Sequence, residues 1–143
     1  MIGVIVTGHG SFASGMYSAL KLMAGKPEKF TAVDYSQQDT TDDIEFRLRD
    51  TITEMMQECS AVLILADVYE GTPYREAVEM KTKMTDIPIE VVAGVNLGML
   101  VQVNLSRGYV SDVSDLADLA VEEGKKQTLK YVYTVKDAEY YDD

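Results

Sequence analysis

The residue best suited to chemistry in this chain is His9, its single histidine. It lies between Gly8 and Gly10 in the segment 7–11, which directly follows the apolar run 2–6 and where the chain is expected to leave a buried strand and turn. Small neighbours let a reactant approach the imidazole, whose unprotonated nitrogen can act as a nucleophile or accept a proton. Because open α/β sheets place their sites at the carboxyl ends of strands, this position favours a functional role over space filling.

A second candidate, Asp67, follows the apolar run 61–66 in the same way. A carboxylate that binds one imidazole nitrogen fixes the tautomer, leaves the other nitrogen free to attack, and stabilises the cation formed after substitution. Taken alone, an aspartate at this position could equally cap a helix or form a turn. The proposed pair of His9 and Asp67 therefore depends on a fold that brings the two strand ends together.

Glycine-containing turns supply a third group of candidates, at positions where helices are expected to begin. These are Gly10 with Ser11, and Gly71 with Thr72. Backbone N–H groups and hydroxyls at helix starts can hold phosphoryl oxygens. The chemistry indicated by the three groups together is phosphoryl transfer on a histidine.

The elements that must position these residues follow from apolar periodicity. Strands are expected at 2–6, 30–35, 61–66 and 87–93, and helices at 11–25, from about 40 to 59, 72–84, 99–106 and 111–123. Thr72 is expected to be an N-cap with Pro73 in the first turn, and Gly124 to end the last helix. Cys59 is expected on the apolar face of the second helix, in a packing role.

The alternating order of strands and helices predicts an α/β fold, a flavodoxin-like doubly wound parallel sheet with helices on both faces. In the common strand order 2-1-3-4, the first and third strands are neighbours whose connections leave in opposite directions. The crevice at their carboxyl ends would place His9 opposite Asp67.

The tail departs from this rhythm. Residues 128–135 alternate apolar and polar side chains, which predicts an edge strand or an arm exchanged with a partner in a homodimer. Residues 137–143 are expected to be a solvated acidic end. We therefore divide the chain into a domain at 1–127 and a C-terminal strand or arm with its tail at 128–143.

Composition narrows the partners and the compartment. The 143 residues fit one domain, and 13 Lys+Arg against 24 Asp+Glu give a net charge of −11, which disfavours nucleic acid as a partner. The longest apolar run, 61–66, is far below the roughly 20 residues of a membrane span, and the N-terminus lacks a signal peptide's basic region. We expect no direct membrane insertion, a cytoplasmic location, and neither a metal nor a cofactor.

Three segments in order resemble the mannose-type IIA component of the phosphoenolpyruvate-dependent sugar phosphotransferase system. They are 3–10, 67–73 and 92–100, within a match over about residues 1–125. The resemblance implies that His9 accepts a phosphoryl group from the histidine phosphocarrier protein and passes it to a IIB domain serving a membrane permease. It also implies that Asp67 orients His9, that Thr72 helps to hold the phosphate, and that Asn96 of the third segment belongs to the phosphate site. Family members form dimers that exchange C-terminal strands.

Two departures from the family pattern lie beside the expected site. Val68 and Glu70 stand where many members have a polar residue and a glycine, so one hydroxyl is missing and a carboxylate is added. That carboxylate would disfavour a bound anion unless it points outward. Some members continue into a fused IIB domain, whereas this sequence stops at residue 143, so a free-standing subunit is expected.

Other functions share parts of this pattern. A non-catalytic flavodoxin-like interaction module has the same architecture. A tetrapyrrole metal chelatase also carries His-Gly-Ser but generally needs a second histidine. A histidine phosphatase needs an arginine just before the His-Gly, where this chain has Gly8, and a receiver domain needs an acidic cluster after its first strand. No residue separates mannose from fructose, sorbose, an amino sugar or a sugar acid as the transported sugar.

Overall fold

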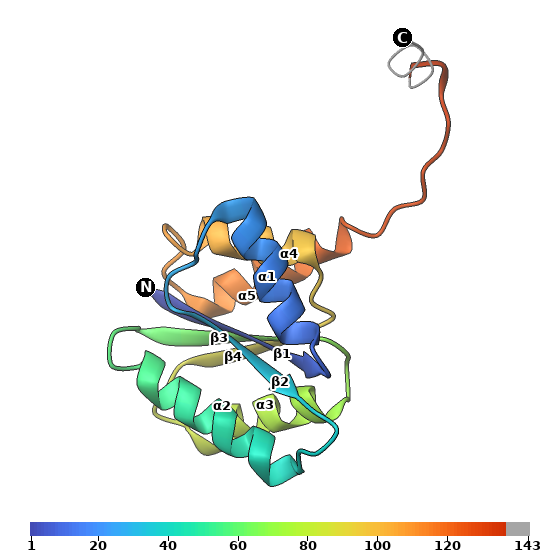
Figure 1. The fold of residues 1–143 in the computed structure, drawn as a ribbon. Helices are drawn as coiled ribbons and strands as arrows, with labels where there is room; N and C mark the ends of the chain where they lie inside the picture. Colours follow the sequence, from blue (N-terminus) through green and yellow to red (C-terminus); the bar gives the residue numbers. More distant parts are fainter. Residues whose placement is uncertain (137–143) are drawn as a thin grey trace.

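A computed structural model of the chain describes residues 1–136, and its centre is a four-stranded parallel sheet of order β2-β1-β3-β4 (Figure 1). The strands are β1 (Ile2–His9), β2 (Phe30–Tyr35), β3 (Ala61–Ala66) and β4 (Ile89–Ala93). The expected doubly wound α/β architecture and strand order are confirmed. β1 lies between β2 and β3, so a residue at its carboxyl end has a neighbouring strand on each side.

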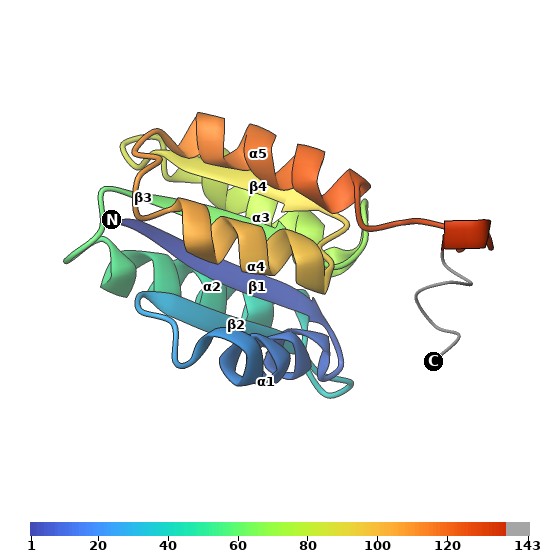
Figure 2. The ribbon, with the colours of Figure 1, turned by 90° about the horizontal axis from the view of Figure 1, so that it is seen from above.

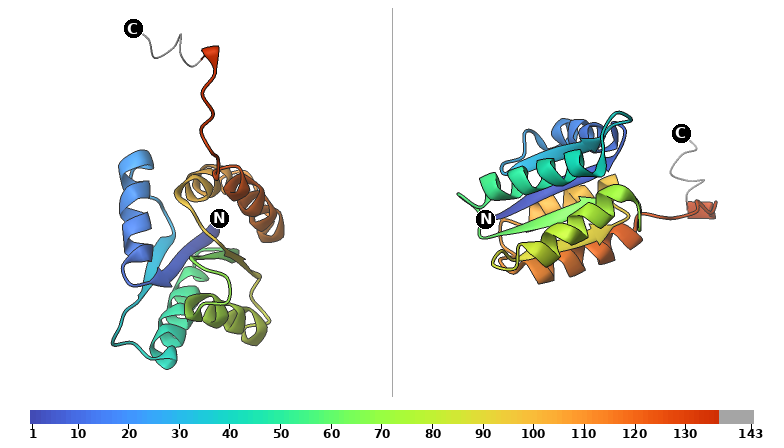
Figure 3. Two further views of the ribbon diagram at one scale, coloured as in Figure 1. Left: turned by 90° about the vertical axis from the view of Figure 1, so that its right-hand side faces the viewer. Right: turned by 90° about the horizontal axis from the view of Figure 1, so that it is seen from below.

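Five helices cover the two faces of the sheet: α1 (Phe12–Ala24), α2 (Thr41–Met55), α3 (Thr72–Lys83), α4 (Leu97–Ser106) and α5 (Val113–Lys125). α1, α4 and α5 pack on one face and α2 and α3 on the other, as the turned views in Figures 2 and 3 show. Connections on both faces are the arrangement that parallel strands require.

The central strand β3 shows how the two layers share one sheet. Its side chains alternate, so Leu63 and Leu65 pack with α1, α4 and α5, whereas Val62 and Ile64 pack with α2 and α3. Every residue of β3 is buried. A strand buried on both faces explains the unbroken apolar run in the sequence.

β1 is longer than its apolar run predicts. It pairs with β2 through His9 opposite Tyr35, so His9 is the last residue of a strand and not part of a turn. Thr7 is fully buried there, and its hydroxyl donates to the Val33 carbonyl at 2.9 Å. This side-chain bond lets a polar residue continue the strand.

The two helix ends expected near Cys59 and Gly124 also differ from the prediction. α2 ends at Met55, so Cys59 lies in the turn that follows, although it is still buried in the core. Gly124 lies inside α5, where a Cβ atom would overlap the terminal methyl of Met99 in α4, so the methionine side chain would have to move. Here glycine permits close packing of two helices and does not end one.

Residues 128–136, the last that the structure describes, form no strand. Residues 128–134 are irregular, and the segment leads away from the body (Figure 1). Leu129, Tyr131, Tyr133 and Val135 are exposed. A strand forms only against another strand's edge, and this segment does not reach one in its own chain. The acidic end expected at 137–143 lies outside the described residues.

Candidate functional site

The site lies where β1 and β3 end side by side. The two strands pair through Thr7 opposite Ala66, and the Asp67 N–H donates to the Thr7 carbonyl at 3.1 Å. A Cβ atom on Gly8 would lie 2.7 Å from Phe12 and 3.0 Å from the Asp67 side chain. Glycine at position 8 therefore makes room for the aspartate beside β1.

His9 and Asp67 form the hydrogen-bonded pair that the sequence predicts. The Nδ1 atom of His9 lies 2.8 Å from Oδ2 of Asp67, and the backbone N–H of His9 donates to the same oxygen at 2.9 Å. The Val68 N–H donates to the other oxygen at 2.8 Å. The His9 side chain is 51% exposed and that of Asp67 only 10%, so a fixed carboxylate holds an accessible imidazole.

The hydrogen bonds also determine the charge of Asp67. Burial opposes ionisation, but the backbone N–H of His9, its ring, and the Val68 N–H together hold the pKa of Asp67 below its ordinary value. The carboxylate is therefore ionised at neutral pH. An ionised carboxylate can only accept a hydrogen bond, so it favours the tautomer in which Nδ1 carries the proton and donates, and Nε2 has the lone pair.

Two further groups contact the imidazole. The ring of Tyr35, at the end of β2, meets it edge to face with centroids 5.9 Å apart and planes at 73°. On another side a Cβ atom on Gly71 would lie 2.9 Å from Cε1 of His9, so the start of α3 lies directly against the ring. Sequence reasoning missed Tyr35, although its place at the end of the strand expected beside the first was a usable signal.

The two glycines of the expected phosphate site do not offer free N–H groups. Gly10, with a φ of 59°, donates to the Tyr35 carbonyl at 2.8 Å, and Gly71 donates to the Val68 carbonyl at 3.2 Å. Their contribution is shape: Gly10 adopts a left-handed backbone that other residues rarely adopt, and Gly71 leaves room for His9. The expectation that they are donors is wrong for their own N–H groups.

Ser11 and Thr72 lie at the starts of α1 and α3. Within residues 1–136 neither hydroxyl has a hydrogen-bond partner. Thr72 is the first residue of α3 and Gly71 is its N-cap, which corrects the expected assignment. The chain is extended at Gly71, so the helix begins at Thr72, one residue earlier than a threonine cap would give.

The two helix starts differ in how well they could accept an anion. The Asp34 carboxylate already accepts the Ser14 N–H in the first turn of α1, at 3.0 Å. α3 has no side-chain cap and no acidic residue in its first turn. The positive end of the α3 dipole is therefore the better place for a phosphoryl group.

Asn96 does not join this group. Its amide oxygen accepts the Met99 N–H at 2.9 Å, and its amide nitrogen donates to the Gly124 carbonyl at 3.0 Å. Both halves of the side chain are thus used to cap α4 and tie it to α5. These bonds give Asn96 a structural role, and its expected part in the phosphate site stays a prediction.

The structure shows how Val68 and Glu70, the two departures from the family pattern, lie beside the site. Glu70 has a φ of 66°, a left-handed conformation that favours the glycine found in many members. Its side chain is 55% exposed, with its carboxylate 3.9 Å from the Arg75 guanidinium. Val68 contributes its N–H to Asp67, and its side chain is exposed.

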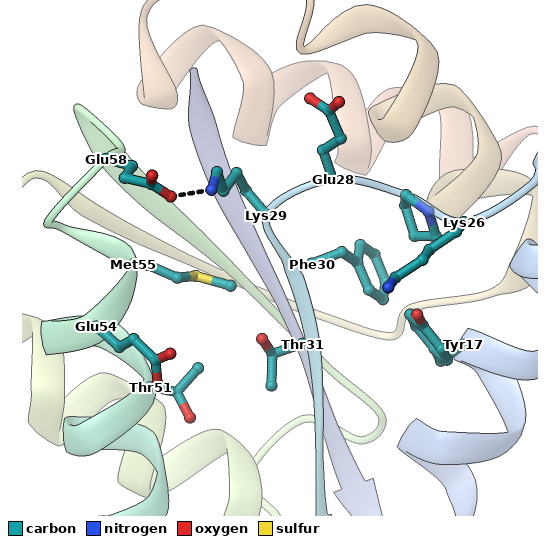
Figure 4. Close-up of a pocket in the computed structure, with 11 residues that line it drawn as sticks. Tyr17, Lys26, Glu28, Lys29, Phe30, Thr31, Thr51, Glu54, Met55 and Glu58 are labelled. Carbon is teal, nitrogen blue, oxygen red and sulfur yellow. Dashed lines mark hydrogen bonds and ion pairs between the residues drawn. The ribbon is translucent and has the colours of Figure 1, made fainter.

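A groove of about 710 Å³ lies away from this site, between the start of β2 and the end of α2 (Figure 4). Phe30 and Thr31 line it, and an ion pair of Lys29 with Glu58 lies at one side. Because Phe30 begins β2 and Tyr35 ends it, the groove lies toward the opposite end of the strand from His9. None of the candidate site residues lines it.

Comparison with known proteins agrees with the geometry. The family model described as "PTS system fructose IIA component" matches residues 3–121. The chain belongs to this mannose-type family of IIA components. Proteins of the family are components of the sugar phosphotransferase system, which confirms the resemblance and replaces the chelatase, phosphatase and receiver alternatives.

Individual IIA proteins show how far the similarity extends. The fructose-specific EIIA component of Bacillus subtilis is 28% identical over 111 residues, which cover 78% of this chain and 74% of that protein. The mannose-specific EIIAB component of Escherichia coli is 24% identical over 125 residues, but the match covers only 38% of that longer protein. The crystal structure of EIIA from Streptococcus agalactiae superposes with a TM-score of 0.85 at 28% identity, covering 91% of this chain and 97% of that one. Within residues 1–136 of this IIA component, no helix has the length and apolar character needed to cross a membrane.

Proposed function

We propose that His9 is the phosphoryl carrier of this IIA component, accepting phosphate from the histidine phosphocarrier protein and passing it to a IIB domain during sugar uptake. The observation that carries the proposal is the 2.8 Å contact between Nδ1 of His9 and the buried carboxylate of Asp67. It directs the lone pair to Nε2 on an imidazole that is half exposed. A protein donor can reach such a nucleophile without any opening of the fold.

The transfer step is a displacement at phosphorus between two imidazoles. Nε2 of His9 attacks the phosphorus atom of the donor's phosphohistidine, and the donor's N–P bond breaks as the new one forms. Nδ1 keeps its proton, and the positive charge that develops on the ring is stabilised by ionised Asp67. Transfer to the IIB domain reverses these roles, with His9 as the leaving group.

The moving phosphoryl group needs donors, and α3 is placed to supply them. Thr72 offers its hydroxyl and its N–H at the start of α3, directly after Gly71, the residue that lies against Cε1 of His9. Ser11 offers a second hydroxyl from the start of α1. Gly10 and Gly71 shape the site without donating. The site would thus neutralise the phosphoryl oxygens with dipoles and hydroxyls.

The assembly is also part of the proposal. Residues 1–127 form the phosphotransferase domain, and residues 128–136 would pair with a partner subunit's sheet edge in a cytoplasmic homodimer. Five large apolar side chains exposed on one short segment support this, because a partner would bury them. Deletion of residues 128–143 should convert a dimer to a monomer in light scattering. An unchanged dimer would exclude the arm, and a monomeric full-length protein would exclude the whole assembly.

The decisive experiment for the function is phosphorylation by a reconstituted donor chain. The protein is mixed with phosphoenolpyruvate, the first enzyme of the system and the histidine phosphocarrier protein. One acid-labile phosphate per chain is expected by mass spectrometry under alkaline conditions, and none in His9→Gln. Because His9 is the only histidine, a phosphohistidine can form nowhere else. If an active donor chain leaves the wild type unlabelled, the non-catalytic interaction module becomes the better account.

A further inference from the structure

The imidazole of His9 has neighbours on both flanking strands, and only one of them holds it by a hydrogen bond. On the β3 side, the Asp67 carboxylate binds Nδ1. On the β2 side, Tyr35 lies directly opposite His9 in the strand register, and its ring contacts the imidazole edge to face at 5.9 Å. The hydrogen bond fixes one nitrogen and the start of α3 lies against Cε1, but a ring joined to the backbone by two rotatable bonds also needs a contact on its β2 side to stop it turning that way.

Tyr35 is itself held firmly enough to provide that contact. Its side chain is half buried and packs against the core cluster formed with α2 and α3. Its carbonyl accepts the Gly10 N–H at 2.8 Å, which fastens the chain directly after His9 to the end of β2. The carbonyl bond does not depend on the side chain, so the ring can be altered without removing this backbone link.

We propose that Tyr35 is a positioning residue for His9: its aromatic ring blocks rotation of the imidazole toward β2 and keeps Nε2 directed at the incoming phosphoryl group. This inference deepens the proposed function and rests on it. Tyr35 touches neither donor nor phosphate in this mechanism, and it acts only through the orientation of His9. The ring, not the phenol hydroxyl, is the part required.

The chain offers matched variants that separate this role from general packing. Tyr35→Phe keeps the ring and removes the hydroxyl. Tyr35→Leu keeps an apolar side chain against the core and removes the ring contact. Tyr17→Leu is the control, because Tyr17 makes a comparable ring contact with Phe30, 5.6 Å between centroids, at the other end of β2.

The kinetic readout is the rate of phosphorylation by the phosphocarrier protein at limiting and saturating donor. Tyr35→Leu should lower kcat about twofold to tenfold with an unchanged KM, which is the range that loss of one aromatic pair gives. Tyr35→Phe should restore the wild-type kcat, and Tyr17→Leu should leave it unchanged. A raised KM with an unchanged kcat would overturn the proposal, since it would make Tyr35 a docking residue.

The second readout is NMR of the unphosphorylated protein, in which His9 gives the only histidine signals. Scalar couplings should report one χ1 rotamer in the wild type and in Tyr35→Phe, and an average over rotamers in Tyr35→Leu. A single wild-type rotamer in Tyr35→Leu would overturn the proposal. If the wild type accepts no phosphate at all, the proposed function fails, and these couplings still decide whether Tyr35 positions the ring.

Discussion

Polar side chains at the two ends of the parallel sheet differ in burial and in hydrogen bonding. At the amino end, Arg107 follows α4 and is 5% exposed, with its guanidinium bonded to the carbonyls of Ile2, Glu28 and Lys29. At the carboxyl end, the imidazole of His9 is half exposed, and the hydroxyls of Ser11 and Thr72 have no partner within residues 1–136. The buried polar group at the amino end stabilises the fold, whereas the polar groups at the carboxyl end remain able to bind a ligand.

This difference teaches where function can be placed on a doubly wound sheet. Helices begin at the carboxyl ends of strands and present N–H groups and positive dipoles there. Helix ends and carbonyls gather at the amino end, where a buried cation such as Arg107 stabilises them. Substitutions at the two ends should therefore separate cleanly into losses of transfer and losses of stability.

The largest expected effect is at the carboxyl end. Asp67→Asn should slow phosphoryl transfer to His9 by about 10²–10⁴-fold, because an amide cannot stabilise the imidazolium or favour a proton on Nδ1 as a carboxylate does. Rapid-quench measurement of phosphohistidine checks this, with circular dichroism to confirm the fold. A wild-type rate in a folded variant would show that the pair has no catalytic role.

The next effect belongs to the amino end and should leave transfer alone. Arg107→Met removes the donor to three carbonyls and should lower the free energy of unfolding by about 2–4 kcal/mol. Arg49→Met is the control, because its partly exposed i,i+4 ion pair with Glu45 within α2 contributes only about 0.5 kcal/mol. Urea denaturation measures both. A loss of transfer rate in folded Arg107→Met would contradict the separation of the two ends.

A smaller effect is expected from the start of α3. Thr72→Val keeps the backbone N–H and removes one hydroxyl, so transfer should fall by about 10-fold to 150-fold, as for loss of one hydrogen bond to a charged group. Thr82→Val, near the other end of α3, should have no effect on the rate. Equal rates for both variants and the wild type would place the phosphate elsewhere.

The smallest effect concerns backbone strain beside the site. Glu70→Gly should raise the free energy of unfolding by about 0.5 kcal/mol, since relief of the left-handed conformation outweighs glycine's greater entropy in the unfolded chain. Glu70→Ala should give no such gain, because alanine keeps the strain. Thermal denaturation distinguishes the two, and equal stability of both variants would mean that the φ of 66° is not costly here.

Acid should act on the same site through Asp67. Because folding lowers the pKa of this carboxyl, its contribution to stability is complete above its ordinary pKa and is lost as pH falls through the lowered value. The wild type should therefore lose more stability than Asp67→Asn between about pH 5 and pH 2. If the free energies of unfolding of the two proteins changed in parallel over that interval, the three N–H partners of the carboxylate would not contribute to stability.

The fold and the pair of His9 and Asp67 could be predicted because both depend on the spacing of apolar residues, which can be read from the sequence. The apolar run 61–66 marks a strand buried on both faces, and the strand order then places Asp67 beside His9. Tyr35 could not be assigned in the same way, because its contact depends on the register between β1 and β2. The periodicity of residues 128–135 indicates a strand. It does not show which sheet edge this strand would join, or whether that edge belongs to the same chain or to a partner subunit.

The phosphate-site residues show the other limit of prediction. Asn96 and Thr72 both follow strand ends at helix starts, yet the amide of Asn96 is used within the protein and the Thr72 hydroxyl, among residues 1–136, is not. A polar residue at a helix start can cap the helix or bind a ligand, and only side-chain direction separates the two. Gly124 is similar, because a helix-ending glycine and a packing glycine look alike in sequence.

The central claim is that Asp67 holds Nδ1 and leaves Nε2 of His9 as the nucleophile. Phosphorus NMR of the phosphorylated protein at alkaline pH tests it most directly, because the two phosphohistidine isomers have distinct chemical shifts. The account predicts a single resonance from phosphate on Nε2. A resonance from phosphate on Nδ1 would contradict it, since that nitrogen is the one hydrogen-bonded to the Asp67 carboxylate.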